Sequence, residues 1–137
     1  MKKFLLIALS LVILLSLMSC KSDSDDQTVN VPDKKFTLNM FTGEGVFLME
    51  SGLPFKGGTN LYDVLINIFK ERDIPYTDID GFFTKIGDYE NNDEYGWLYE
   101  VDNVTASVGV KEYILNGGET VNMFYMNYND YFSQRGY

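Results

Sequence analysis

The first twenty residues constrain this chain more than any other feature. Two lysines follow Met1, an almost uninterrupted apolar run extends from Phe4 to Leu17, and a cysteine stands at position 20. A cationic head, an apolar segment and small residues before a cleavage point are the pattern of a secretory signal peptide. The apolar run is shorter than the roughly 20 residues that a membrane-spanning helix needs. We therefore predict that residues 1–19 are a signal peptide and that the rest of the chain builds the fold.

The end of this segment, Leu17-Met18-Ser19-Cys20, resembles the lipobox of bacterial lipoproteins. That resemblance implies that Cys20 is acylated, with palmitate for example, and becomes the first residue after cleavage. Two or more acyl chains anchor a protein stably to a membrane, so we expect a lipid-anchored protein on the extracytoplasmic face of the cell membrane. An ordinary signal peptide that is cleaved near a cysteine is the alternative. Cys20 is the only cysteine, so the chain cannot form an internal disulfide.

The net charge argues against one class of partner. The chain carries a formal charge of −9, and loss of Lys2 and Lys3 with the signal peptide would change it to −11. Proteins that bind DNA or RNA use clustered Lys and Arg side chains to neutralise phosphates. We therefore predict no nucleic-acid partner.

Composition changes along the chain. Residues 20–34 are polar and contain no aromatic side chain, so they cannot bury enough apolar surface to order themselves, and we predict a flexible membrane tether. The domain is predicted to span residues 35–127. Residues 128–137 are polar and rich in tyrosine, and we predict a tail that frays at the end of the chain.

The clearest element within the domain is one amphipathic helix. It is predicted to begin after Thr59 or Asn60, either of which can cap it, and to end near Arg72. Its apolar residues recur at i, i+3, i+4, i+7 and i+8, which places them on one face. They are Leu61, Val64, Leu65, Ile68 and Phe69.

The remaining pattern predicts short strands. Phe36, Leu38 and Met40 alternate with polar residues, and a turn at residues 42–45 leads to a returning strand at 46–50. Further extended segments are predicted at residues 53–55, 82–86, 96–101 and 120–126, with an acidic loop at 87–94. Two hairpin-like pairs around one helix predict an α+β fold.

Three segments, in order, resemble the transcobalamin-like C-terminal domain family, a small β-grasp-like module of exported bacterial proteins. They are GTNLYDVL at residues 58–65, GWLYEVDN at 96–103, and the stretch from Ala106 to Val121 that contains ASVGV, YIL and GETV. The resemblance implies a β-grasp-like fold, with small mixed or antiparallel sheets and one main helix packed across them. One departure is Asn103, which stands where the family usually has Gly, although Asn also tolerates a positive φ.

The resemblance also implies a ligand. In vertebrate relatives this module closes over cobalamin, and the hairpin after the Trp strand approaches the corrin. Carried over by position, the implied ligand-binding residues are Trp97, Tyr99, Asp102, Asn103, Thr105, Ser107 and Val108. The residues themselves leave a choice open, because Trp97 and Tyr99 share one face of a strand and can form either core or a binding platform. The vertebrate carriers add a large helical domain, for which this chain has no room, so we expect weak binding or a partner.

Catalytic chemistry has little support in the sequence. The chain contains no histidine, its single cysteine is predicted to carry lipid, and no nucleophile-elbow, Walker or dinucleotide motif is present. We therefore predict a protein that is not an enzyme. The acidic loop allows two weaker alternatives, a hydrolase site or a calcium site at Asp88, Glu90 and Asp93, although the spacing does not match an EF-hand.

We therefore expect a surface lipoprotein that binds a small organic ligand and assists its uptake. A corrinoid such as cobalamin is the first candidate, and a membrane transporter or a second surface protein is the expected partner. The alternative is a non-catalytic module that docks a cell-surface protein or glycan.

Overall fold

Residues 33–136 are described by the structure, a computed structural model, and every structural statement below concerns them. They belong to one compact unit, Val31–Tyr137. The predicted signal peptide, Cys20 and all but the last two residues of the predicted tether lie outside the described residues.

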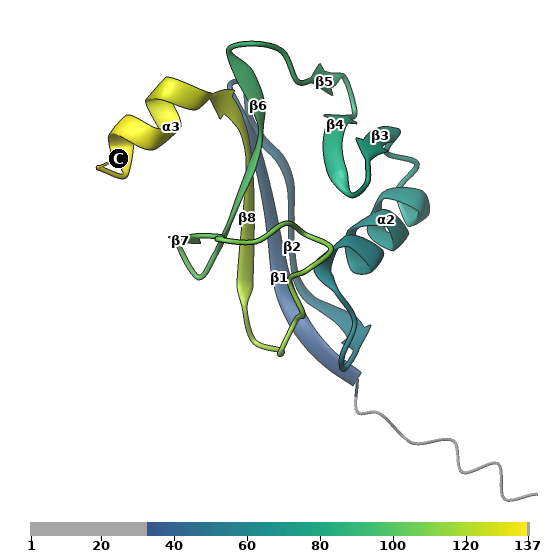
Figure 1. Cartoon of the computed structure of the whole chain (residues 1–137). Helices are drawn as coiled ribbons and strands as arrows, with labels where there is room; N and C mark the ends of the chain where they lie inside the picture. Colours follow the sequence, from purple (N-terminus) through teal and green to yellow (C-terminus); the bar gives the residue numbers. More distant parts are fainter. Residues whose placement is uncertain (1–32, 137) are drawn as a thin grey trace, which may run out of the picture. The chain divides into compact units, whose positions relative to one another are not determined.

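The main element is a five-stranded sheet in the order β2-β1-β8-β6-β7 (Figure 1). Its strands are β1 (Asp33–Thr42), β2 (Gly45–Lys56), β6 (Tyr95–Val101), β7 (Val104–Thr105) and β8 (Thr120–Asn127). Strands β1 and β8 pair in parallel, with Leu38 opposite Val121, whereas all other pairs are antiparallel. The prediction of hairpin-like pairs missed this parallel contact, which joins the two ends of the domain.

Strand β2 is longer than the sequence indicated. The segments 46–50 and 53–55 were expected to be separate, but both pair with β1 as one strand. The register shifts between Phe36 and Leu38, and Gly52 adopts φ +69°. A bulge of this kind absorbs turn-forming residues without ending a strand, so Ser51-Gly52 marks an irregularity within β2.

A second, three-stranded antiparallel sheet has the order β3-β4-β5. Its strands are β3 (Tyr76–Ile79), β4 (Phe82–Ile86) and β5 (Tyr89–Glu90). The turn between β3 and β4 has positive φ at Asp80 (52°) and Gly81 (86°). Such a two-residue turn matches the twist of a hairpin. Strand β4 agrees with the prediction, whereas β3 was not expected and β5 interrupts the expected loop at 87–94.

Helix α2 (Leu61–Glu71) confirms the prediction from apolar spacing, and all five residues of the predicted stripe are buried. Asn60 is the cap, because its side-chain oxygen accepts a hydrogen bond from the Asp63 backbone N–H at 2.8 Å. In Figure 1 α2 and the small sheet lie on the same side of the large sheet. Phe69 links these parts, since its ring contacts those of Tyr76 and Phe83.

The hydrophobic core lies between α2, the small sheet and one face of the large sheet. Phe36, Leu38 and Met40 of β1 point into it together with Val121 and Met123 of β8. All buried apolar residues of the described chain fall between positions 36 and 131. The core of the described residues thus lies within residues 31–137, and we expect this fragment to fold in isolation.

The C-terminal residues differ from the predicted fraying tail. Residues Tyr128–Gln134 form a second helix, α3, and Tyr131 is fully buried. The Asn127 side chain caps this helix by accepting a hydrogen bond from the Asn129 N–H at 2.9 Å. The chain is therefore a mixed α and β fold with two described helices and mostly strand, consistent with the expected α+β class. Within residues 33–136, no helix has the length and apolar character needed to cross a membrane.

Candidate ligand-binding site

A pocket of about 410 Å³ lies beside β6. Its walls come from the β3–β4 turn, the middle of β6, the segment after β7, and α3. Most of its lining is apolar, and six aromatic residues contribute to it: Phe82, Phe83, Trp97, Tyr99, Tyr131 and Phe132. Pockets of this size and character are typical of small-molecule sites.

The pocket exists because β6 lacks a full neighbour on one edge. Strand β7 pairs only with Glu100 and Val101, and its last contact is the bond from the Ala106 N–H to the Tyr99 carbonyl at 3.4 Å. The chain then leaves the sheet. Further along the edge, the Trp97 N–H donates to the Asn91 side chain at 3.1 Å. The part of β6 between these two bonds, residues 97–99, forms a wall of the pocket.

The pocket extends round this edge of the sheet. Paired residues point to the same face, so Tyr99 and its partner Met123 lie on the side of α2, whereas Leu98 and its partner Phe124 lie on the opposite side. Tyr131 of α3 contacts the Phe124 ring, with centroids 6.2 Å apart. Because Tyr99, Leu98 and Tyr131 all line the pocket, a ligand there would contact elements from both faces.

Trp97 and Tyr99 are partly core and partly pocket wall. Trp97 is 6 % exposed, its indole Nε1 donates to the Tyr89 carbonyl at 3.1 Å, and its ring meets those of Phe47 and Tyr125. The Tyr99 hydroxyl donates to the Val108 carbonyl at 2.5 Å. Burial, followed by the nearby Tyr113 and Glu112, raises the Tyr99 pKa to about 12. Tyr99 is therefore a neutral donor at physiological pH.

The structure separates the seven residues that the family resemblance implied. Trp97, Tyr99, Thr105 and Val108 line the pocket, but Asp102, Asn103 and Ser107 do not. Asp102 and Asn103 form the turn between β6 and β7, both with positive φ (51° and 64°).

Their side chains hold the turn to β8. Asp102 accepts from the Thr120 N–H at 2.8 Å, and Asn103 accepts from the Asn122 side chain at 3.2 Å. These bonds give the two turn residues a structural role, and Asn103 adopts a positive φ, which Asn tolerates.

Several lining residues were missed by the sequence reasoning. Phe82 and Phe83 come from the small sheet, Val110 and Lys111 from the segment after β7, and Phe132 from α3. A signal for α3 did exist: the cap residue Asn127 precedes aromatic residues at i, i+3 and i+4, the spacing of one helix face. These are Tyr128, Tyr131 and Phe132.

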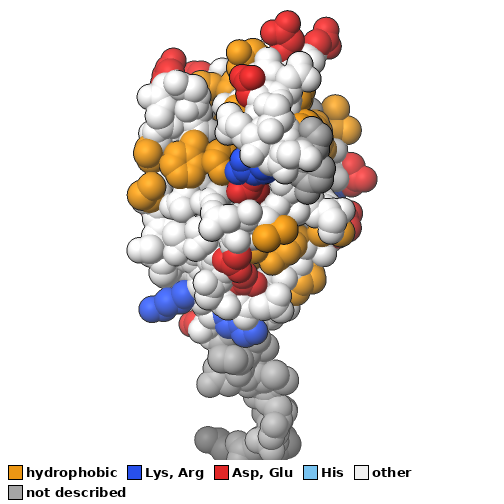
Figure 2. Space-filling view, turned by 90° about the vertical axis from the view of Figure 1, so that its left-hand side faces the viewer, with side chains coloured by type: hydrophobic (Ala, Val, Ile, Leu, Met, Phe, Trp, Pro, Cys, Tyr) orange, Lys and Arg blue, Asp and Glu red, His pale blue; other side chains and the backbone are white. Residues whose placement is uncertain are grey.

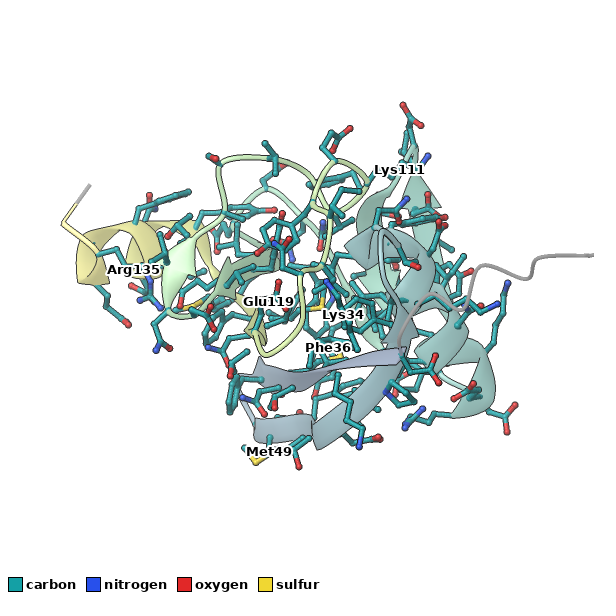
Figure 3. All side chains as sticks on the ribbon, turned by 90° about the horizontal axis from the view of Figure 1, so that it is seen from below. Lys34, Phe36, Met49, Lys111, Glu119 and Arg135 are labelled. Carbon is teal, nitrogen blue, oxygen red and sulfur yellow. The ribbon has the colours of Figure 1, made fainter. Side chains whose placement is uncertain are left out.

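The mouth of the pocket carries charge. Lys111 Nζ lies 2.8 Å from Asp80 Oδ1, and it also lies 5.2 Å from the centre of the Tyr62 ring. Each partner favours the charged form of the other, so this hydrogen bond raises the Lys111 pKa and lowers the Asp80 pKa. The pair tethers the β3–β4 turn to the segment after β7 (Lys111 is labelled in Figure 3). Both residues are exposed enough that the pair adds little to stability.

A buried carboxylate lies behind the pocket. Glu100 is 1 % exposed, forms an ion pair with Arg135, and accepts a hydrogen bond from the Tyr131 hydroxyl at 3.1 Å. The same hydroxyl lies 2.9 Å from the Thr105 hydroxyl. Among residues 33–136, no buried side-chain polar atom lacks a partner. This network joins β6, β7 and α3.

The alternative calcium site was predicted at Asp88, Glu90 and Asp93. No group of three acidic, histidine or cysteine side chains in the described chain is arranged to hold a metal ion. Glu90 lies on β5, where its carboxylate is 3.8 Å from Lys85 Nζ. The hairpin β4–β5 places Glu90 opposite Lys85.

The family model of a domain of unknown function, DUF4430, matches residues 58–127, just over half of the chain. The chain belongs to the DUF4430 family. No curated protein is detectably similar in sequence.

A solved structure of haptocorrin in complex with Cbi has the same fold over 72 % of this chain, with a TM-score of 0.62 and 15 % identity. The match covers 26 % of haptocorrin, so the chain spans about a quarter of that protein. A putative metal binding protein from Ruminococcus gnavus matches 69 % of this chain and 97 % of its own length, with a TM-score of 0.49 and 9 % identity.

Proposed function

We propose that the protein is a lipid-anchored, extracytoplasmic binding protein whose DUF4430 domain holds a small organic ligand in the pocket beside β6. A corrinoid is the first candidate. The observation that carries the proposal is the aromatic pocket itself, which forms at the Trp97–Tyr99 strand where the family resemblance had placed a ligand. The shared fold with haptocorrin, whose structure contains Cbi, supports the corrinoid. We also infer a β-grasp-like fold, since α2 packs across a mixed sheet.

The size of the pocket indicates how a large ligand would bind. A cavity of about 410 Å³ lies at the small end of ligand sites, which range from about 300 to 1,000 Å³. A corrinoid would therefore insert an edge and leave much of its surface exposed. Binding by this domain alone is expected to be weak, and a transporter or a second surface protein would cover the rest.

The direct test is a titration of residues 31–137 with cobalamin and with dicyanocobinamide, followed by corrin absorbance and by fluorescence of Trp97, the only tryptophan. Val108→Glu places a charge in the pocket wall at a residue that is 44 % exposed, so we expect it to weaken binding at least about tenfold without unfolding the domain. Val46→Glu is the matched control, because it adds the same charge at a valine that is exposed on β2, at the far edge of the sheet. Absence of any spectral change at high micromolar ligand would refute a corrinoid.

A second function is favoured by the surface around the pocket. Ile79 and Phe82 of the β3–β4 hairpin are 72 % and 59 % exposed, and Val108 and Phe132 are also exposed. Figure 2, which views the molecule from the side of α3 and β7, shows apolar side chains in separate groups between polar ones. Apolar side chains that stay exposed beside a pocket offer a partner molecule apolar surface to bury. A non-catalytic module that docks a surface protein or glycan is therefore the alternative.

The two proposals predict different results when binding partners are captured from the cell envelope. A docking module should recover one stoichiometric partner from the envelope of the parent cell, and Phe82→Ser should abolish that recovery. Val46→Thr should leave it intact. Recovery of no partner would count against docking and would leave binding of a small ligand as the proposed function.

The membrane anchor is tested separately, because Cys20 lies outside the described residues. Intact-mass analysis should show cleavage before Cys20 and added fatty acid, and Cys20→Ser should release the protein from the membrane fraction. An unmodified, unprocessed chain in the cytosol would refute the proposed location.

A further inference from the structure

Helix α3 begins at Tyr128, directly after the match to the family domain ends at residue 127. Two of its residues, Tyr131 and Phe132, nevertheless line the pocket. From this geometry we infer that α3 is a ligand-contacting wall, and that Phe132 and Tyr131 help to determine which ligands this chain accepts. The inference rests on the proposed binding function and adds a specificity element outside the family domain.

The rings of Tyr131 and Phe132 pack against each other. Tyr131 and Phe132 meet edge to face, with centroids 5.2 Å apart at 81°. Tyr131 is fully buried, whereas Phe132 is 41 % exposed and can contact an incoming molecule. In Figure 1 α3 lies on the side of the large sheet away from α2. The wall therefore faces Leu98, whose side chain points to that side of β6.

The helix needs an anchor, because seven residues are too few to hold a helix in water without tertiary contacts. The anchor is the ion pair between Arg135 and the buried Glu100. The Arg135 guanidinium also lies 4.7 Å from the Tyr131 ring centre and 5.7 Å from that of Phe124 (Arg135 is labelled in Figure 3). These contacts fix the position of Tyr131. They also fix Phe132, which follows Tyr131 in the chain and packs against its ring.

The Tyr131 hydroxyl also connects the wall to β7. The Tyr131 hydroxyl bonds both Glu100 and Thr105, and Thr105 itself lines the pocket. A ligand that displaces α3 must therefore break contacts to a buried charge, which is costly. We expect a wall of nearly fixed position that selects ligands by shape, favouring those with a flat apolar edge.

The test compares Phe132→Ala with Gln134→Ala, which changes an exposed residue of the same helix that does not line the pocket. Two probes are used with residues 31–137: dicyanocobinamide, and toluene as a small apolar molecule. Backbone amide NMR shifts locate each probe. We expect shifts at residues 98, 131 and 132 with either probe, and an affinity about fivefold weaker in Phe132→Ala, the loss expected for about 1 kcal/mol of ring contact. Gln134→Ala should bind as the unchanged chain does.

The possible outcomes distinguish a failure of the α3 wall from a failure of the proposed binding function. If dicyanocobinamide is silent but toluene shifts both β6 and α3, the wall is supported and the corrinoid proposal fails. If either probe shifts β6 while α3 and the affinity of Phe132→Ala stay unchanged, the inference is overturned. If neither probe shifts any pocket residue, both the wall and the binding function fail. A far-UV spectrum and a thermal transition confirm that each variant is folded.

Discussion

Replacing Arg135 with glutamine should destabilise the domain by an amount set by the burial of Glu100. Glu100 is 1 % exposed, and Arg135 is the only cationic side chain that contacts it among the described residues. Removing one partner of a fully buried ion pair costs about 3–5 kcal/mol, because a buried charge loses its compensation. The Arg135 side chain is 28 % exposed, so water can reach the carboxylate in its place. We therefore expect a loss at or just below the lower bound of that range, about 2–3 kcal/mol.

The assay is equilibrium unfolding of residues 31–137 in urea. For a domain of this size the m-value is about 1–3 kcal/mol/M, so the midpoint should fall by about 1 M. A double-mutant cycle identifies the cause. Glu100→Gln removes the buried charge, so the double variant with Arg135→Gln should be more stable than Arg135→Gln alone. A loss below about 0.5 kcal/mol, or strictly additive effects in the cycle, would refute the reasoning.

Three further predictions concern the β6–β7 turn, the cap of α2 and the Tyr99 hydroxyl. Asn103→Ala should lower the free energy of unfolding by about 1–2 kcal/mol, because Ala tolerates φ 64° less well than Asn does and because the bond to Asn122 is lost. Asn103→Gly loses the same bond but has no Cβ to strain, so it should lose less, and equal losses in urea unfolding would contradict this. Asn60→Ala removes the cap of α2 and should cost about 1 kcal/mol, with Thr59→Ala as a comparison that leaves this cap intact. Tyr99 has a folded pKa of about 12, above that of an unfolded tyrosine, so its contribution to stability is complete below pH 10 and is lost as the pH rises from 10 to 12. Tyr99→Phe should make the decline of stability between these pH values shallower. An unchanged slope would show that folding does not raise the Tyr99 pKa.

Local pattern was sufficient for the elements whose partners lie close in sequence. The five-residue stripe of α2 and its cap could be read directly, because helix periodicity and capping depend on neighbouring residues. The strands at 82–86, 96–101 and 120–126 were also near their observed bounds. Strand β3 was missed, because four residues with alternating exposure give too short a pattern to stand out.

The site was predicted only in part. The strand with Trp97 and Tyr99 does form a pocket wall, but Asp102 and Asn103 serve the turn. Polar residues in a loop after a functional strand look alike in sequence, whether they face a ligand or bond the next strand. The wall from α3 was missed for a different reason, since a polar, tyrosine-rich C-terminus reads as a tail unless its buried partner is known.

The sequence by itself determined the periodic elements, the acidic charge and the family, because each depends on the order and type of residues along the chain. Tertiary structure decided the parallel pairing of β1 with β8, the free edge of β6 and the docking of α3. These features join residues that lie far apart in sequence, such as Glu100 and Arg135. The energy of such contacts comes from burial and from pairing of buried charge, which no local pattern records.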